Sequence, residues 1–163
     1  MSEARGECIP SPLVNAIVSA YQIAITKALG AGANAMAQML LTELGDFLSD
    51  YVESVIGEMD YEDVKGAVRK IFQELGLAKE VKIEEKDGKW VIEVRGSVFI
   101  PTYKILAQRG IQFFTLSPEA LLIASIIRKS LRIKGDQKAR VRVNAETPQD
   151  EVLRFEVQQI SSL

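Results

Sequence analysis

The strongest constraint on the fold is a change of hydrophobic period after Gly76. Before this residue, apolar side chains recur about every three to four positions, as they do in amphipathic helices. From Val81 onward, apolar and polar residues alternate, which places them on opposite faces of a strand. Asp87-Gly88 separates two alternating runs and strongly predicts a β-hairpin. Helices followed by hairpins indicate the α+β class with an antiparallel sheet.

Three helices are predicted before the first hairpin, over residues 12–29, 34–56 and 61–75. We expect Ser11 to cap the first helix and Asp60 to cap the third. Ser117-Pro118-Glu119 predicts the start of a fourth helix, since it combines a cap, a proline at the first helical position and an acid in the first turn. Residues 101–116 are expected to form a loop that is long for a compact domain.

Two further alternating runs, 139–143 and 153–157, predict a second hairpin. The expected fold is α+β: an antiparallel four-stranded sheet of two hairpins with one helix packed on it and an N-terminal three-helix layer. The length suits one hydrophobic core. We therefore expect a flexible N-terminal tail over residues 1–11 and a single α+β domain over 12–163.

The chain contains no histidine, and Cys8 is its one cysteine. These counts exclude Ser-His-Asp and Cys-His catalytic sites, histidine-ligated zinc or haem, and an intrachain disulfide. We expect no cofactor and no metal. The net charge of −2 predicts no binding of nucleic acid, and the apolar stretches are too short to span a membrane. A cytoplasmic location follows, and the many interspersed charged residues hint at a thermophilic source.

Four acids of the second helix, Glu43, Asp46, Asp50 and Glu53, fall on one side of it. Their carboxylates could hold a hard cation, but calcium sites normally need a shaped loop with a glycine turn. A solvated acidic face is therefore the favoured interpretation.

Three other features are weaker candidates for a site. Arg140 and Arg142 could clamp an anion together with Arg154, although the outer face of a sheet explains them as well or better. Residues 30–34 could cradle an anion before a helix, but they lack the lysine of a P-loop and favour a helix–helix turn. Cys8 is interpreted as a plain free thiol.

The fourth helix is apolar almost all round from Ala120 to Ile127, apart from Ser125. Such a helix must be covered on more than one side. The sheet can cover one side, and the N-terminal helices, a partner chain or a ligand must cover the other. The preceding loop is also rich in apolar residues, which is typical of binding loops, although ordinary core packing is the favoured alternative. The predicted ligand-binding residues are Tyr103, Phe113, Phe114, Leu121 and Leu122.

The order of these elements resembles vinyl-4-reductase-type hydrocarbon-binding domains and the small TRAPP vesicle-tethering subunits. The likeness rests on Leu75-Gly76-Leu77, the hairpin from Val81 to Ile100, residues 117–124 and the closing hairpin. It implies a domain that is often dimeric and accepts an acyl, isoprenoid or tetrapyrrole-like ligand. Many such domains carry cysteines where this chain has Ser117 and residues 144–150, so a bound metal or an acylated cysteine is not expected. No residue matches a catalytic role of the reductases.

Three functions remain open from the sequence. The first is a non-catalytic binding protein, expected to be a homodimer, with an apolar pocket for a small hydrophobic ligand. The second is a scaffold or adaptor that binds no ligand and whose apolar surface is a protein interface. The predicted interface residues are Ile17, Tyr21 and Leu121. The third is an enzyme that uses carboxylates, lysine or Tyr103, and it ranks last because nothing clusters these groups.

Overall fold

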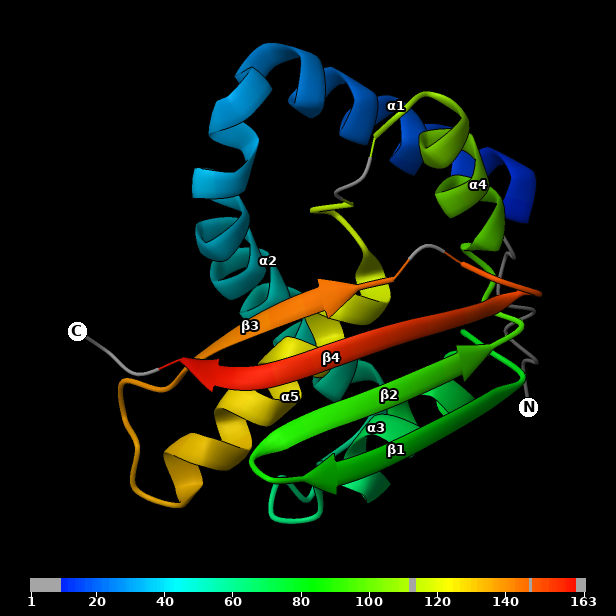
Figure 1. Cartoon of the computed structure of the whole chain (residues 1–163). Helices are drawn as coiled ribbons and strands as arrows, with labels where there is room; N and C mark the ends of the chain where they lie inside the picture. Colours follow the sequence, from blue (N-terminus) through cyan, green and yellow to red (C-terminus); the bar gives the residue numbers. More distant parts are fainter. Residues whose placement is uncertain (1–9, 112–113, 147, 161–163) are drawn as a thin grey trace.

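The computed structural model describes residues 10–111, 114–146 and 148–160, without the side chains of 31, 33–35, 37 and 38. It confirms the α+β class, with helices that precede a four-stranded antiparallel sheet (Figure 1). The elements in chain order are α1 (Ser11–Leu29), a short 3-10 helix (Gly30–Gly32), α2 (Ala33–Ile56), α3 (Val64–Glu74), β1 (Glu80–Lys86), β2 (Lys89–Arg95), α4 (Ile100–Gln108), α5 (Pro118–Ile133), β3 (Arg140–Ala145) and β4 (Val152–Ile160).

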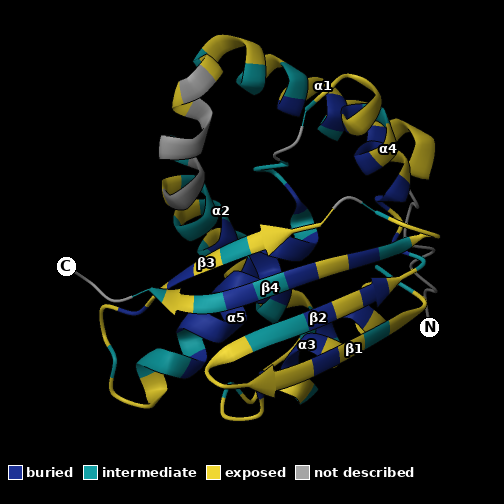
Figure 2. Ribbon diagram, viewed as in Figure 1, coloured by how far each residue is buried: buried dark blue, intermediate teal, exposed yellow. Residues whose placement is uncertain are grey.

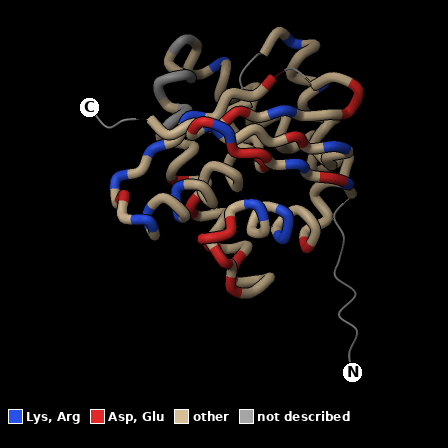
Figure 3. The backbone as a smooth tube through the Cα atoms, turned by 60° about the horizontal axis from the view of Figure 1, so that its bottom comes forward, with Lys and Arg blue, Asp and Glu red and all other residues tan. Residues whose placement is uncertain are grey.

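The sheet has the strand order β1-β2-β4-β3, so the two hairpins join through β2 and β4. Ile92 pairs with Phe155 across this junction, and both side chains are fully buried. Between β1 and β2, Asp87 and Gly88 have positive φ values of 52° and 75°, as a two-residue hairpin turn requires. The predicted turn is therefore confirmed. On the outer face, basic and acidic residues are interspersed along the strands (Figure 3).

Helices cover only one face of the sheet. α3 and α5 lie against it, and α2 packs on the far side of α5 (Figures 1 and 2). α1 extends beyond the sheet and packs on α4 instead. The three N-terminal helices thus precede the sheet as predicted, with α2 and α3 both against α5 and α1 against α4.

Local differences from the prediction have identifiable causes. Residues 101–116 were expected to form a loop, and this was wrong for α4, whose first turn contains Pro101 as helix starts often do. Asp63, not Asp60, caps α3 by accepting a hydrogen bond from the Gly66 amide at 3.0 Å. Asp60 instead accepts from the Glu62 amide in the preceding turn. Pro10, rather than Ser11, is the residue before α1.

α1 presents its polar side to the protein interior. Asn15, Ser19 and Gln22 are its buried residues, whereas Ile17 and Tyr21 are exposed. Leu13, Ile17 and Tyr21 recur at helical spacing, as the sequence indicates, but they are exposed, whereas Val14 and Val18 pack against the core. Within the described residues, no helix is both long and apolar enough to cross a bilayer.

Candidate functional site

An open space lies between α4 and the connection from β3 to β4. This space, here called the α4 hollow, has a volume of about 290 Å³. Its walls come from α4 and the residues after it, from Phe114 and from the β3–β4 connection. The lining residues are Tyr103, Leu106, Ala107, Gly110, Ile111, Phe114, Ala145, Glu146 and Pro148.

Two aromatic rings form one wall of the hollow. Tyr103 and Phe114 meet edge to face, with ring centroids 4.8 Å apart and an angle of 76° between the planes. Edge-to-face contacts of this kind are favourable because the positive edge of one ring meets the negative face of the other. Tyr103 is buried and Phe114 half-buried, so the pair connects the hollow to the protein interior.

Behind Tyr103 lies a buried cluster of one carboxyl and three hydroxyl groups. The Ser97 hydroxyl donates to one Glu119 oxygen. The Ser117 and Tyr103 hydroxyls lie 3.3 Å and 3.4 Å from the other oxygen. Tyr103 and Ser117 are also hydrogen-bonded to each other at 2.5 Å. All four side chains are buried, so they satisfy one another rather than face solvent.

Burial raises the pKa of Glu119 above its ordinary value, and hydrogen bonds from Ser97, its own amide, Ser117 and Tyr103 only partly offset this effect. No lysine or arginine of the described chain is among the groups that shift it. Burial, and after it the Glu119 charge, raises the pKa of Tyr103 well above its usual range. The Tyr103 phenol is therefore neutral. The Glu119 carboxyl also stays protonated more readily than an exposed glutamate does.

Polar side chains of α1 hold the segments around the hollow in place. Asn15 accepts hydrogen bonds from the amide and hydroxyl of Thr102 in α4, at 3.1 Å and 2.7 Å, and donates to the Val98 carbonyl. Gln22 accepts from the Thr115 hydroxyl at 2.9 Å and from the Leu116 amide at 3.0 Å. α1 thus fixes both α4 and the segment that leads into α5.

The sequence is similar to that of another protein. It is 44% identical to the uncharacterized protein MJ0312 of Methanocaldococcus jannaschii, in a match that covers 93% of this chain and 79% of that protein. The chain belongs to the family of that protein. No family model matches the sequence. The relative's name mentions neither ligand nor partner, so the resemblance to hydrocarbon-binding and vesicle-tethering domains stays a hypothesis.

The structure brings together only part of the predicted ligand-binding set. Tyr103 and Phe114 line the α4 hollow, while Phe113 lies outside the described residues. Leu121 and Leu122 do not line it, because both are 3% exposed and packed within the core layers. What covers the second side of α5 is α2 of the same chain. Leu121 therefore belongs to the interior, whereas Ile17 and Tyr21 are exposed.

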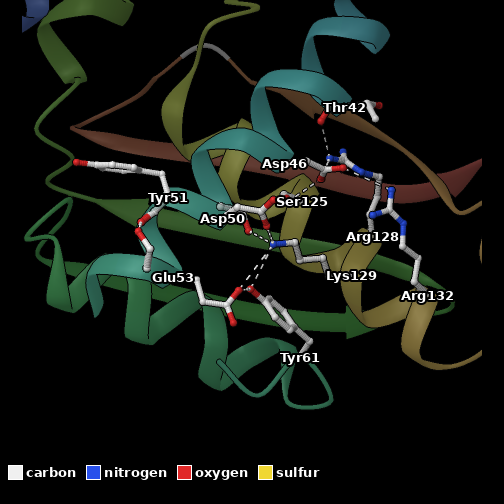
Figure 4. Close-up of polar contacts among 12 residues, drawn as sticks. Thr42, Asp46, Asp50, Tyr51, Glu53, Tyr61, Ser125, Arg128, Lys129 and Arg132 are labelled. Atoms are coloured by element: carbon white, nitrogen blue, oxygen red, sulfur yellow. Dashed lines mark hydrogen bonds and ion pairs between the residues drawn. The ribbon is translucent and has the colours of Figure 1, made fainter. Parts of the chain in front are cut away.

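Three acids of α2, Asp46, Asp50 and Glu53, lie within 4.0 Å of basic residues of α5, whereas Glu43 is exposed as a solvated face predicts. Figure 4 shows Asp46 beside Arg128 and Arg132, with Nη2–Oδ distances of 2.5 Å and 3.5 Å. Burial opposes ionisation of Asp46, but the hydrogen bonds and charges of Arg128, Ser125 and Arg132 outweigh it and hold its pKa below the ordinary value.

A second group continues this contact one turn further along the two helices. Lys129 Nζ lies 2.5 Å from Asp50, 2.8 Å from the Ser49 hydroxyl and 3.9 Å from Glu53, while the Tyr61 hydroxyl donates to Glu53 at 2.6 Å (Figure 4). Burial opposes the charge of Lys129, but Asp50 and Tyr61 more than compensate and raise its pKa. No group of acids in the described residues could hold a metal ion. The carboxylates therefore fasten α2 to α5.

The remaining candidates show no clustered chemistry. Arg140 and Arg142 lie on the exposed face of β3, while Arg154 forms a 3.8 Å ion pair with Glu146. Gly30–Gly32 is a short 3-10 turn between α1 and α2, as the helix–helix interpretation predicts. Cys8 lies outside the described residues. The α4 hollow is therefore the site that the geometry favours.

Proposed function

We propose that the protein is a non-catalytic binding protein whose α4 hollow accepts a small apolar ligand. The observation that carries this proposal is the convergence of Leu106, Ile111 and Phe114, together with the Tyr103 ring, on a space of about 290 Å³. Concave sites with apolar and aromatic walls are the usual form of small-molecule sites. Among the described residues, none has a side chain that occupies this space.

Its size narrows the class of ligand. Ligand sites usually measure roughly 300–1,000 Å³, so the hollow is at the small end of this range. A short acyl or isoprenoid group suits that volume better than a tetrapyrrole ring. The charged group at its edge is Glu146, an exposed acid. Since a carboxylate repels another anion, we favour a ligand with an uncharged head, such as an isoprenoid alcohol.

The nearby acid does not make the hollow a catalytic site. Glu119 is fully buried, does not line the hollow, and directs its oxygens toward Ser97, Ser117 and Tyr103. A catalytic acid or base must come within hydrogen-bonding reach of the substrate. With the Tyr103 ring between Glu119 and the hollow, we assign the cluster a structural role.

Calorimetric titration with geraniol tests the proposal. Ala107 lines the hollow from the exposed side of α4, so Ala107→Trp should fill the space without disturbing the core. We expect the unmodified protein to bind geraniol and Ala107→Trp to bind it at least about tenfold more weakly, a loss of about 1.4 kcal/mol. Gln108→Trp is the matched control, because Gln108 is exposed on the same helix but does not line the hollow.

Two outcomes would contradict the proposal. If the unmodified protein binds neither geraniol nor a short-chain alcohol, the hollow is not a ligand site. If Ala107→Trp binds as well as Gln108→Trp, the ligand lies elsewhere. The scaffold alternative, in which no ligand is bound, is favoured by the exposed apolar side of α1 and would then become the leading function.

A further inference from the structure

The outward face of α1 is apolar over most of its length. Leu13, Ile17 and Tyr21 follow one another at intervals of four residues and are 52%, 46% and 65% exposed. The only charged residue in the helix is Lys27, near its C-terminal end. Isolated apolar residues on a surface are ordinary, but a contiguous uncharged row along a helix marks an interaction surface.

The polar face of the same helix is already used. Asn15 and Gln22 hold α4 and the Thr115–Leu116 segment through the hydrogen bonds described above. α1 is therefore fixed with its apolar face outward and cannot rotate to bury that face without breaking these bonds. The described part of this chain therefore leaves the face uncovered.

Beside the large residues runs a second row of small ones. Ala16, Ala20 and Ala24 are all exposed, and each follows a large residue by three positions. Residues three apart are neighbours on a helix surface. The face therefore consists of a ridge of large side chains next to a groove of alanines, and alanines allow a neighbouring helix axis to approach to about 8 Å.

We propose that a second copy of the chain covers this face, with the two α1 helices antiparallel about a twofold axis between residues 18 and 19. In this register Leu13 lies opposite Ala24 of the second copy, Ile17 opposite Ala20, and Tyr21 opposite Ala16. Every large side chain meets a small one, so the ridge of each helix enters the groove of the other. A twofold contact requires this self-complementarity.

Charge supports a second copy over other occupants. The absence of charge from Leu13 to Tyr21 means that two copies can approach without repulsion between like charges. A helix that binds an anionic membrane usually carries lysine or arginine along its polar side, whereas the polar side of α1 carries amides and hydroxyls and is buried. The inference is independent of the α4 hollow, since no α1 residue lines that hollow.

Sedimentation equilibrium of the full chain tests the pairing. The unmodified protein should sediment at twice the 18.0 kDa of one chain at micromolar concentration. Ala20→Glu places two acids near the axis and should raise the dissociation constant at least about tenfold. Because Ala20 is exposed, the circular dichroism spectrum should not change. Tyr51→Glu is the matched control, since Tyr51 is 63% exposed on α2 and should leave the dimer intact.

A size exchange tests the register itself. Ile17→Ala should weaken the dimer by leaving a cavity, and Ala20→Ile should weaken it by overpacking. Since the two positions oppose each other across the axis, the double variant should regain most of the lost affinity. A monomeric unmodified protein, additive losses in the double variant, or sedimentation with phosphatidylcholine vesicles that Ala20→Glu abolishes would each overturn the proposal.

Discussion

The guanidinium of Arg128 in α5 lies 2.5 Å from a carboxylate oxygen of Asp46 in α2, although the arginine is only 1% exposed. Nη1 donates to the Leu41 carbonyl oxygen and Nη2 also donates to the Thr42 carbonyl oxygen, while Nε is buried without a partner in the described structure. Asp46 keeps 27% of its side chain exposed. The pair is thus asymmetric, with a buried cation and an anion that still reaches water.

This asymmetry predicts unequal effects of removing the two partners. Asp46→Ala leaves a buried guanidinium without its counter-ion, which should lower the free energy of unfolding by about 3–5 kcal/mol. Arg128→Met leaves an acid that water can solvate, so we expect a loss of less than half that size. Urea unfolding measures both values, and equal losses would show that burial of the arginine does not matter.

Close packing of α2 on α5 depends on Gly45. A methyl group at this position would lie 2.8 Å from the Leu121 carbonyl oxygen, and this backbone atom cannot move without shifting α5. Gly45→Ala should therefore destabilise the protein by about 1–3 kcal/mol, despite the better helix propensity of alanine.

Gly32→Ala is the matched control for this effect. Gly32 has a φ of −72°, and a methyl group added there would have no atom of the described structure within 4 Å. The substitution should be neutral or stabilising by up to about 1 kcal/mol. If thermal unfolding ranks the two variants in the opposite order, the close approach at Gly45 is not limiting.

The buried Glu119 predicts a dependence of stability on pH. Its folded-state pKa is raised above the ordinary value of 4.5, so the protonated acid favours the fold and this contribution disappears as pH rises through the folded-state pKa. Glu119→Gln keeps a polar group for Ser97 and Ser117 but does not titrate. Relative to this variant, the unmodified protein should lose stability as the pH rises above 4.5.

Unfolding of both proteins across this pH range provides the measurement. A difference that is independent of pH would mean that Glu119 titrates as it does in the unfolded chain. A difference that grows in favour of the unmodified protein would mean that the hydroxyl groups stabilise the carboxylate more than burial opposes it.

We expect the hydrogen bonds of Asn15 to hold α1 against α4. Asn15→Ala removes the acceptor at 2.7 Å from the buried Thr102 hydroxyl and leaves it only the backbone carbonyl of residue 15 at 3.4 Å, so the loss should be about 0.5–1.5 kcal/mol. Hydrogen exchange should also accelerate in Ile100–Gln108 more than in β4. Ala28→Ser, at an exposed position of the same helix outside the proposed dimer contact, should leave both quantities unchanged.

Features set by a few adjacent residues were predictable from the sequence. Asp87-Gly88 specifies its hairpin through backbone conformation, and Ser117 caps α5 by accepting a hydrogen bond from the Ala120 amide at 3.2 Å. The short α4 was missed, although Pro101 in its first turn is a helix-start signal. The pairing of β2 with β4 joins distant segments, and local patterns do not specify it.

The direction in which a helix faces was harder to predict than its existence. Apolar spacing places Ile17 and Tyr21 on one face of α1, and packing normally turns such a face inward. Here the amide side chains of Asn15 and Gln22 make the inward contacts. The apolar period therefore predicts the helix correctly but not the side that faces inward. For α2 and α5, the sequence contained the signal, since Asp46 and Asp50 lie four residues apart on α2 and their partners Arg128 and Lys129 lie next to each other on α5. Only a comparison of the acidic side of α2 with the basic side of α5 would have shown that the two sides pair.

The position of β4 also has a consequence for how the chain acquires its shape during synthesis. β4 hydrogen-bonds to β2 on one edge and to β3 on the other, yet it is the last of the four strands to be translated. Until Val152–Ile160 leaves the ribosome, the first hairpin has an open edge and α5 has an incomplete surface to lie on. Such late, long-range pairing slows folding and leaves an unpaired strand edge exposed. A nascent chain of this protein should therefore depend on chaperones until its final strand emerges.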